Sequence, residues 1–304
     1  MLEVFEERVP SEDVLLVNKC ATIRSDGIGA ARRGFFAEAE QSFRECHVML
    51  DAAVRLTPES RMLALTFLRA AEAYLAYRHG EIEQVRSLVY EAMRADVALE
   101  TSYGYTMGTH RIQLAGNLMK AVGYANRDEA MRLGIGILDV LEGDATSCPV
   151  PEVADPIDLA GTPPDLLSLM ANQIIGEMAI VLADTGVEQA RKLFSAAMIH
   201  VERRATGNCP KFAYSHDWLA VKQAFLDRDV DCFLIRATEL LAAGRRDDST
   251  LWFATAVDLS VLCHEFNIAG GDIVLERLVN DAQSWENVTA RLLAVIEDLR
   301  GTSG

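Results

Sequence analysis

Basic residues are scarce in this sequence, and their scarcity excludes two broad classes of partner. Lysine and arginine together number 29 against 45 aspartates and glutamates, which gives a formal net charge of -16. Nucleic-acid binding and docking on anionic membranes both depend on basic side chains that neutralise phosphates. We therefore expect no direct nucleic-acid partner and no membrane partner, and the acidity is typical of a soluble protein.

Paired cysteines and long apolar runs are also missing. The six cysteines include no C-x-x-C pair and stand far apart: Cys20, Cys46, Cys148, Cys209, Cys232 and Cys263. A chain of 304 residues, half of them apolar, can form a core without disulfides, so we interpret the six cysteines as reduced thiols of a cytoplasmic protein. The acidic N-terminus has no apolar signal region, and no run approaches 18 apolar residues, so we expect no membrane span.

Motifs that carry catalysis or hold cofactors are absent as well. There is no H-E-x-x-H, no P-loop, no G-x-G-x-x-G and no Glu-x-x-His pair. His200, Cys209 and His216 match no compact zinc pattern. The acidic run 227–231 is more typical of a helix cap than of a magnesium site. We therefore predict no catalytic residue, no metal and no cofactor.

Most of the chain shows the apolar spacing of amphipathic helices, and no stretch alternates like a strand. Ser11, Glu12 and Asp13 favour a helix start, and Thr57 with Pro58 predicts another, with a cap followed by a first-turn proline. The spacing predicts an all-α protein of about 12 helices in antiparallel pairs. The first pairs cover about 11–33 with 36–55, 58–79 with 81–99, and 109–125 with 127–141.

One long irregular segment, 143–164, separates two halves of the chain. It holds five of the eight prolines: Pro149, Pro151, Pro156, Pro163 and Pro164. The segment is either a functional loop or a boundary between lobes. We therefore divide the chain into N-terminal hairpins at 1–142, a proline-rich insertion at 143–164 and C-terminal hairpins at 165–304. The two sets favour one continuous array, with later pairs at about 165–186 with 187–205 and 217–228 with 230–243.

Small residues recur at matching places in these pairs. In the first pair, the residues that face the partner helix around the Gly34 break are Gly27, Ala30, Ala39, Phe43 and Cys46. Equivalent breaks stand at 34, 80, 125, 185 and 229, at intervals of 46, 45, 60 and 44 residues. The pattern resembles the tetratricopeptide-repeat superfamily, with helices longer than its 34-residue unit. That resemblance implies a right-handed superhelical array of antiparallel helical hairpins.

The resemblance also implies a function. In that family the first helix of each hairpin lines a concave groove that binds a peptide or protein. Here the matching positions give the candidate partner-binding residues Arg24, Arg32, Tyr74, Tyr77, Arg78, Asn172, His216 and Gln223, with Phe67, Ile112, Met119 and Val122 beside them. Tyrosine and arginine are common anchors of such interfaces. We therefore expect a non-enzymatic regulator, adaptor or assembly factor.

Other interpretations stay open at this stage. A helical enzyme or small-ligand sensor would use the aromatic segments 102–106 and 212–218, which we expect to be loops with His216 nearby. A homo-oligomer would use the end faces of the array. A helical bundle without repeats would also place small residues at close helix contacts.

Overall fold

The computed structural model describes residues 8–123, 125–144, 148–150, 159, 161–183, 191, 194, 210–243, 249–268, 270–282, 294, 296–298 and 300–301. Every secondary-structure element in these residues is an α-helix, which confirms the all-α prediction. The chain divides into two compact units, Met1–Pro163 and Pro164–Gly304, each of which is described by itself. The helix expected at 187–205 lies mostly outside the described residues.

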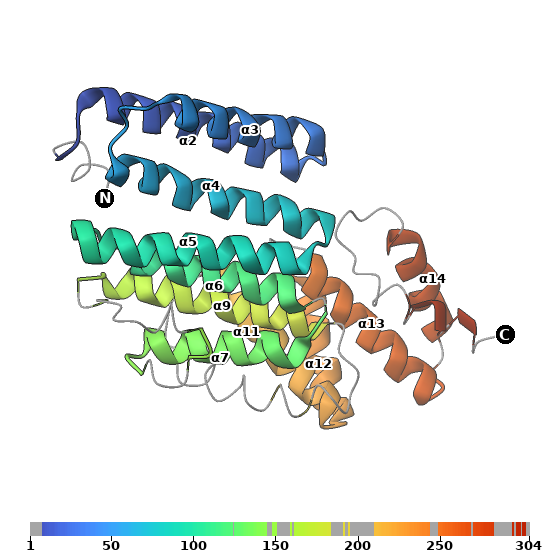
Figure 1. The fold of residues 1–304 in the computed structure, drawn as a ribbon. Coiled ribbons are helices and arrows are strands. Elements are labelled where there is room, and N and C mark those ends of the chain that lie inside the picture. Colours follow the sequence, from blue (N-terminus) through green and yellow to red (C-terminus); the bar gives the residue numbers. More distant parts are fainter. Residues whose placement is uncertain are drawn as a thin grey trace. The chain divides into compact units, whose positions relative to one another are not determined.

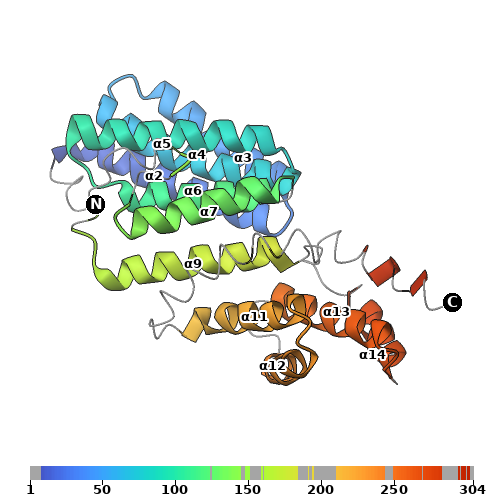
Figure 2. The same cartoon turned by 90° about the horizontal axis from the view of Figure 1, so that it is seen from below.

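The described helices of unit 1 form three antiparallel hairpins (Figure 1). They are α2 (Ser11–Arg32) with α3 (Phe36–Ala52), α4 (Pro58–His79) with α5 (Ile82–Tyr103), and α6 (Gly108–Gly123) with α7 (Arg127–Leu141). Between hairpins, α4 contacts α2, α3 and α6, and α5 contacts α6. Figure 2 shows the same helices from below, with α6 and α7 side by side.

Local signals place the ends of these helices. Gly34 and Gly80 adopt the left-handed backbone with φ of 83° and 77°, which side chains disfavour, so each ends a helix and turns the chain. The Thr57 hydroxyl accepts a hydrogen bond from the Ser60 amide, and Pro58 occupies the first turn, as the sequence predicts. In the second unit, the Asp229 side chain likewise caps the helix Val230–Ala242 by accepting a hydrogen bond from the Cys232 amide at 3.1 Å.

The start of α2 differs from the prediction. Its N-cap residue is Pro10, which provides no side-chain hydrogen bond, and Ser11 is the first helical residue and does not act as the cap. The Asp13 carboxylate instead accepts hydrogen bonds from the Thr57 amide at 3.0 Å, the Thr57 hydroxyl at 2.6 Å and the Ser60 hydroxyl at 2.8 Å. Burial raises the pKa of Asp13, but these bonds outweigh it and hold the pKa below its ordinary value. Asp13 thereby joins α2 to the start of α4.

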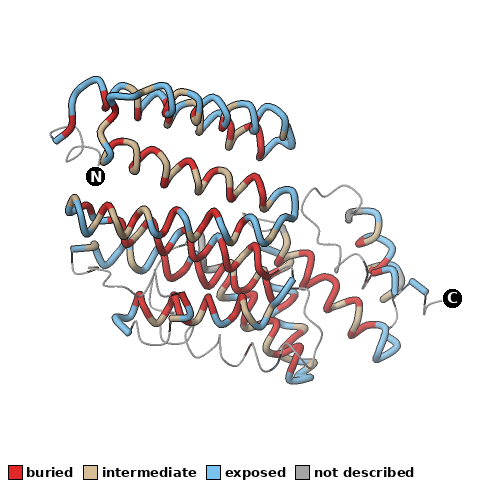
Figure 3. Tube along the Cα trace, viewed as in Figure 1, coloured by how far each residue is buried: buried red, intermediate tan, exposed pale blue. Residues whose placement is uncertain are grey.

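The core of the first hairpin depends on small residues, as the sequence indicates. A Cβ atom added at Gly27 would lie 2.6 Å from Cε1 of Phe43, so α2 and α3 approach too closely for any side chain there. Ala39, Phe43 and Cys46 are buried on the facing side of α3. Burial raises the pKa of the Cys46 thiol to about 12, which identifies it as a packed structural thiol. Figure 3 shows buried residues along one side of α2 and α3 and over most of α6.

Part of the proline-rich segment packs against α7. A Cβ atom added at Gly136 would lie 2.5 Å from Cδ of Pro149 and 3.1 Å from Cα of Cys148. Val150 is fully buried, and burial raises the pKa of the Cys148 thiol. Residues 148–150 therefore belong to the packed surface of unit 1, and Gly136 allows that contact.

Unit 2 contains α9 (Pro164–Ala183), α11 (Pro210–Leu226), α12 (Val230–Ala242), α13 (Ser249–Glu265) and α14 (Gly271–Ala282). α11 contacts α9, α12 and α13, and α13 contacts α9, α12 and α14. Lys222 and Asp258 are buried between α11 and α13, where Nζ lies 2.8 Å from both carboxylate oxygens. The helix start expected at 217 is wrong, because α11 begins at Pro210, and a proline is favoured in a first helical turn.

Candidate functional site

The face of unit 1 formed by α2, α4 and α6 carries a row of interlocked basic and aromatic side chains. The Arg24 guanidinium lies over the Phe67 ring at 5.1 Å, and that ring lies 4.5 Å from the His110 imidazole. His110 Nδ1 is 2.7 Å from the buried Asp96 carboxylate, which also accepts from the Thr66 hydroxyl. Burial lowers the pKa of Arg24. The row therefore places the partly desolvated Arg24 guanidinium against the Phe67 ring, and its side chains come from three helices, α2, α4 and α6.

A second group lies along α2 and α4 nearer their C-terminal ends. Arg78 donates to the Arg32 carbonyl at 3.1 Å and to the Tyr74 hydroxyl at 3.4 Å. The Tyr74 and Tyr77 rings lie 6.2 Å apart. Both tyrosines are half-buried, whereas Arg32 and Arg78 are exposed. The structure thus brings together the candidate residues that the sequence assigns to the first two hairpins.

Candidate residues farther along the chain have a different environment. Ile112, Met119 and Val122 are core residues of α6, with at most 1% of each exposed, so they line no groove. Hydrophobic spacing alone does not distinguish them from groove residues, because α6 is buried on nearly all sides. Asn172 of α9 is 3% exposed, and it forms no part of the surface proposed below.

His216 and Gln223 both belong to α11 in unit 2. The Gln223 amide nitrogen donates to the Asp227 carboxylate at 2.6 Å, one turn along the helix. His216 is half-buried, its Nε2 has no hydrogen-bond partner within the described residues, and burial lowers its pKa. Nothing is described for His200 and Cys209, the other members of the loose zinc set. Both residues belong to unit 2 and are described apart from the α2–α4 face of unit 1.

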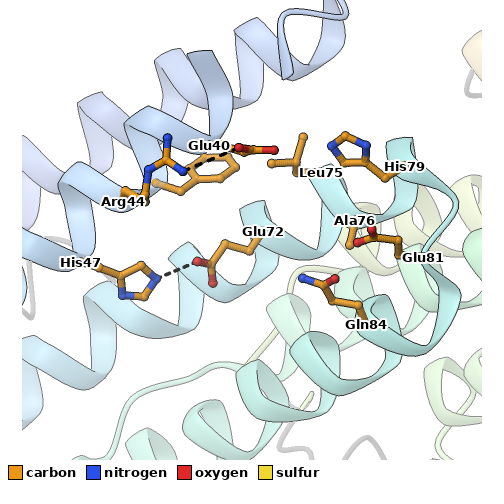
Figure 4. Close-up of a pocket in the computed structure, with 10 residues that line it drawn as sticks. Glu40, Arg44, His47, Glu72, Leu75, Ala76, His79, Glu81 and Gln84 are labelled. Carbon is orange, nitrogen blue, oxygen red and sulfur yellow. Dashed lines mark hydrogen bonds and ion pairs between the residues drawn. The ribbon is translucent and has the colours of Figure 1, made fainter. Parts of the chain in front are cut away.

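Unit 1 also has a hollow of about 340 Å³ that the sequence did not indicate (Figure 4). It is lined by Glu40, Phe43, Arg44 and His47 of α3, by Glu72, Leu75, Ala76 and His79 of α4, and by Glu81 and Gln84 at the start of α5. The buried Phe43, Leu75 and Ala76 supply its apolar part, and charged groups of both signs surround them. None of its lining residues lies on α2, so the hollow is separate from the row described above.

Ionisable groups of the hollow are largely paired with one another. His47 Nε2 lies 2.7 Å from one Glu72 oxygen, and Arg69 donates to the other at 2.7 Å. Arg69 also pairs with Glu91 at 3.0 Å. A carboxylate with both oxygens engaged is poorly placed to act as a free general base. No group of three or more His, Cys, Asp or Glu side chains is placed to hold a metal ion among the residues that the structure describes.

Only one of the two aromatic segments of the alternative prediction is a loop. Residues 104–107 connect α5, which ends at Tyr103, to α6, and the loop residue Tyr105 is buried, with its hydroxyl donating to Glu59 at 2.6 Å. The segment 212–218 is helical and lies within α11, where Trp218 is fully buried, so the loop expected there is wrong. Tyr105 and Trp218 are thus both packed in the interior of their units.

Among the helices that the structure describes, one, α9, is long and apolar enough to cross a membrane by length and composition alone. Its most apolar window of 18 residues has a mean hydropathy of 1.7, and 56% of that window is buried within the protein. Core helices of soluble proteins have the same properties, so α9 is weak evidence for a membrane span.

Comparison of the chain with protein-family models, with curated proteins and with solved structures finds no significant match. The resemblance to tetratricopeptide repeats therefore stays a prediction that rests on the residues themselves.

Proposed function

We propose that this chain is a non-enzymatic helical-repeat protein that binds a peptide or protein partner across α2 and α4. Its role would be that of a regulator, adaptor or assembly factor. We further propose that its hairpins form a right-handed superhelical array. The order of contacts in unit 1 supports the array, since each hairpin packs on the next through α2 with α4, α3 with α4, and α5 with α6.

The observation that carries the proposal is the arrangement of arginines and aromatic rings on the α2–α4 face. Arg24 stacks on Phe67, and Arg78 is held by Tyr74 and by the Arg32 carbonyl. Side chains fixed in this way lose less conformational entropy when a partner binds. Tyrosine and arginine are also the residue types that most often dominate interface energies.

A capture experiment with matched variants tests the proposal. The full chain is immobilised, and proteins retained from lysate of the native organism are compared for wild type and Tyr77→Ala/Arg78→Ala. The control is Tyr90→Ala/Arg94→Ala, which makes the same two truncations on α5. We expect a partner that is retained by wild type and the control and is lost by the first variant. Equal retention by all three proteins would refute a partner site on this face.

Two further expectations belong to the same proposal. We propose a cytoplasmic location, which is supported by the free thiols of the described cysteines, and thiol labelling in intact cells would test it. Self-association is the second possibility, and the exposed side chains of Phe266, Ile268 and Ile273 near the α13–α14 turn would favour it. Sedimentation at several concentrations would show whether a second copy binds.

A further inference from the structure

Six arginines of unit 1 have a carboxylate within 4.0 Å: Arg8, Arg44, Arg61, Arg69, Arg86 and Arg111. In contrast, Arg24, Arg32, Arg33 and Arg78 form no ion pair with any described residue, as is also true of Arg55, Arg94 and Arg132. The first four differ from the other three in position, because all four lie on α2, α4 or the turn after α2. They therefore place several unpaired positive charges on two neighbouring helices of an acidic chain.

Three of these arginines gather with aromatic residues at the Gly34 and Gly80 turns. We call this group the turn cluster: Arg32, Arg33, Phe35, Phe36, Arg78 and His79. The Arg33 guanidinium lies over the Phe35 ring at 5.6 Å, and Arg78 lies over the Phe36 ring at 5.7 Å. The Phe36 ring also packs on the His79 imidazole at 4.6 Å. A guanidinium stacked by its face keeps N–H groups at its edge for binding an anion.

Helix dipoles give an ordinary explanation for part of the cluster. Arg32, Arg78 and His79 lie in the last turns of α2 and α4, where positive charge stabilises the C-terminal carbonyls. That explanation does not require Arg33 and Arg78 to stack on phenylalanine rings. It also leaves Phe35 unexplained, because this ring is 52% exposed in the turn.

The side chains of the cluster indicate which kind of anion it suits. Arg32, Arg78 and His79 lie at two helix C-termini, where Arg78 donates to the Arg32 carbonyl, and Phe36 is the first residue of α3, so position alone does not select the anion. Guanidinium groups form two parallel hydrogen bonds with a carboxylate. The exposed Phe35 ring adds an apolar contact that a peptide side chain can meet.

We propose that the turn cluster binds an acidic peptide segment of the partner, rich in Asp and Glu and containing an apolar residue. This inference rests on the proposed function, because the cluster lies on the same two helices. The net charge of -16 opposes binding of an acidic segment to most other surfaces. Charge would thus direct the segment to the turn cluster and also fix its register.

Fluorescence anisotropy of the full chain tests this inference directly. The probe is a fluorescein-labelled peptide of ten residues, nine Asp or Glu and one central Leu, and its comparison peptide carries Asn and Gln instead. The test variant is Arg32→Gln/Arg33→Gln, and the control is Arg55→Gln/Arg94→Gln. Arg55 and Arg94 are exposed arginines of unit 1, so both variants change the net charge equally. Melting temperatures measured for both variants show whether each is folded.

We expect the acidic probe to bind wild type and the control with similar affinity, and to bind the test variant at least about tenfold more weakly. The Asn and Gln peptide should not bind. Equal weakening in both variants would show a general charge effect and overturn the inference. Binding of the neutral peptide as tightly as the acidic one would overturn it as well.

The capture experiment described above separates this inference from the proposed function. Suppose that Tyr77→Ala/Arg78→Ala loses a partner, while Arg32→Gln/Arg33→Gln leaves both its capture and probe binding unchanged. The partner site then stands, and the acidic segment is overturned. If probe binding depends on the turn cluster while no captured protein depends on Tyr77 and Arg78, the acidic site stands and the proposed function fails.

Discussion

Two glycines on α2 allow a direct test of how closely the first hairpin is packed. Gly27 and Gly29 are two residues apart on the same helix, so the same substitution by alanine can be made at each. A Cβ atom at Gly27 would lie 2.6 Å from Cε1 of Phe43 and 3.0 Å from Cβ of Ser42. At Gly29 the nearest contact would be the flexible Arg33 guanidinium at 3.5 Å. The variants Gly27→Ala and Gly29→Ala should therefore have opposite effects.

The expected magnitudes follow from two opposing contributions. Replacing glycine by alanine inside a helix stabilises it by about 0.5–1 kcal/mol, because the unfolded chain loses conformational freedom. Overpacking a filled core costs about 1–3 kcal/mol. Phe43 is 3% exposed and has little room to move away from a new methyl group at Gly27. We expect Gly29→Ala to stabilise the protein by about 0.5–1 kcal/mol and Gly27→Ala to destabilise it by up to about 2 kcal/mol.

Urea unfolding followed by circular dichroism measures both variants against wild type, and the slope of each transition shows whether the unfolded state has changed. A Gly27→Ala variant as stable as Gly29→Ala would refute the close approach of α2 and α3. It would also weaken the case for the small-residue pattern on which the repeat alignment rests.

Three further predictions concern other contacts. Because hydrogen bonds hold the folded pKa of Asp13 below 3.8, the contribution of its carboxylate to the free energy of unfolding is present above about pH 4 and is lost as pH falls through the folded pKa. Asp13→Asn should therefore lower the free energy of unfolding by about 1.5–3 kcal/mol in urea unfolding at pH 7. An equal difference between wild type and variant at pH 3 would contradict this. Lys222→Met should cost about 3–5 kcal/mol because it leaves Asp258 buried without its partner, whereas Lys222→Met/Asp258→Leu should recover most of that loss by the same assay. Gly136→Ala should displace the loop and speed the reaction of Cys148 with a thiol reagent, and an unchanged rate would argue against the contact.

Much of the fold could be predicted from the sequence because the signals involved are local. Gly34 and Gly80 end helices since their backbone conformation excludes most side chains, and Thr57 with Pro58 begins one within a single turn. Small residues at Gly27 and Ala39 indicated close helix contact. Each of these signals depends on a few neighbouring residues and is therefore readable without the fold.

Candidate site residues were predictable only where a helix face is partly exposed. Arg24 lies over the Phe67 ring, and Arg78 bonds to the Arg32 carbonyl, so both contacts join α2 to α4. The same spacing did not identify surface residues on α6. This helix is buried on nearly all sides, so its apolar pattern does not separate a groove face from a core face. The hollow between α3, α4 and α5 had no sequence signal, since His47 and Glu72 meet only after two helices pack.

The sequence by itself determined the helical pairs of unit 1 and their turns at Gly34 and Gly80, and it indicated which faces carry small residues. Only the tertiary structure decided that Asp13 would bind Thr57, 44 residues away, and that four arginines of α2, α4 and the turn after α2 would form no ion pair with a described residue. Helix ends depend on backbone preferences within a turn or two. Pairing between distant charges depends on which helices become neighbours, and that is settled by packing of the whole unit.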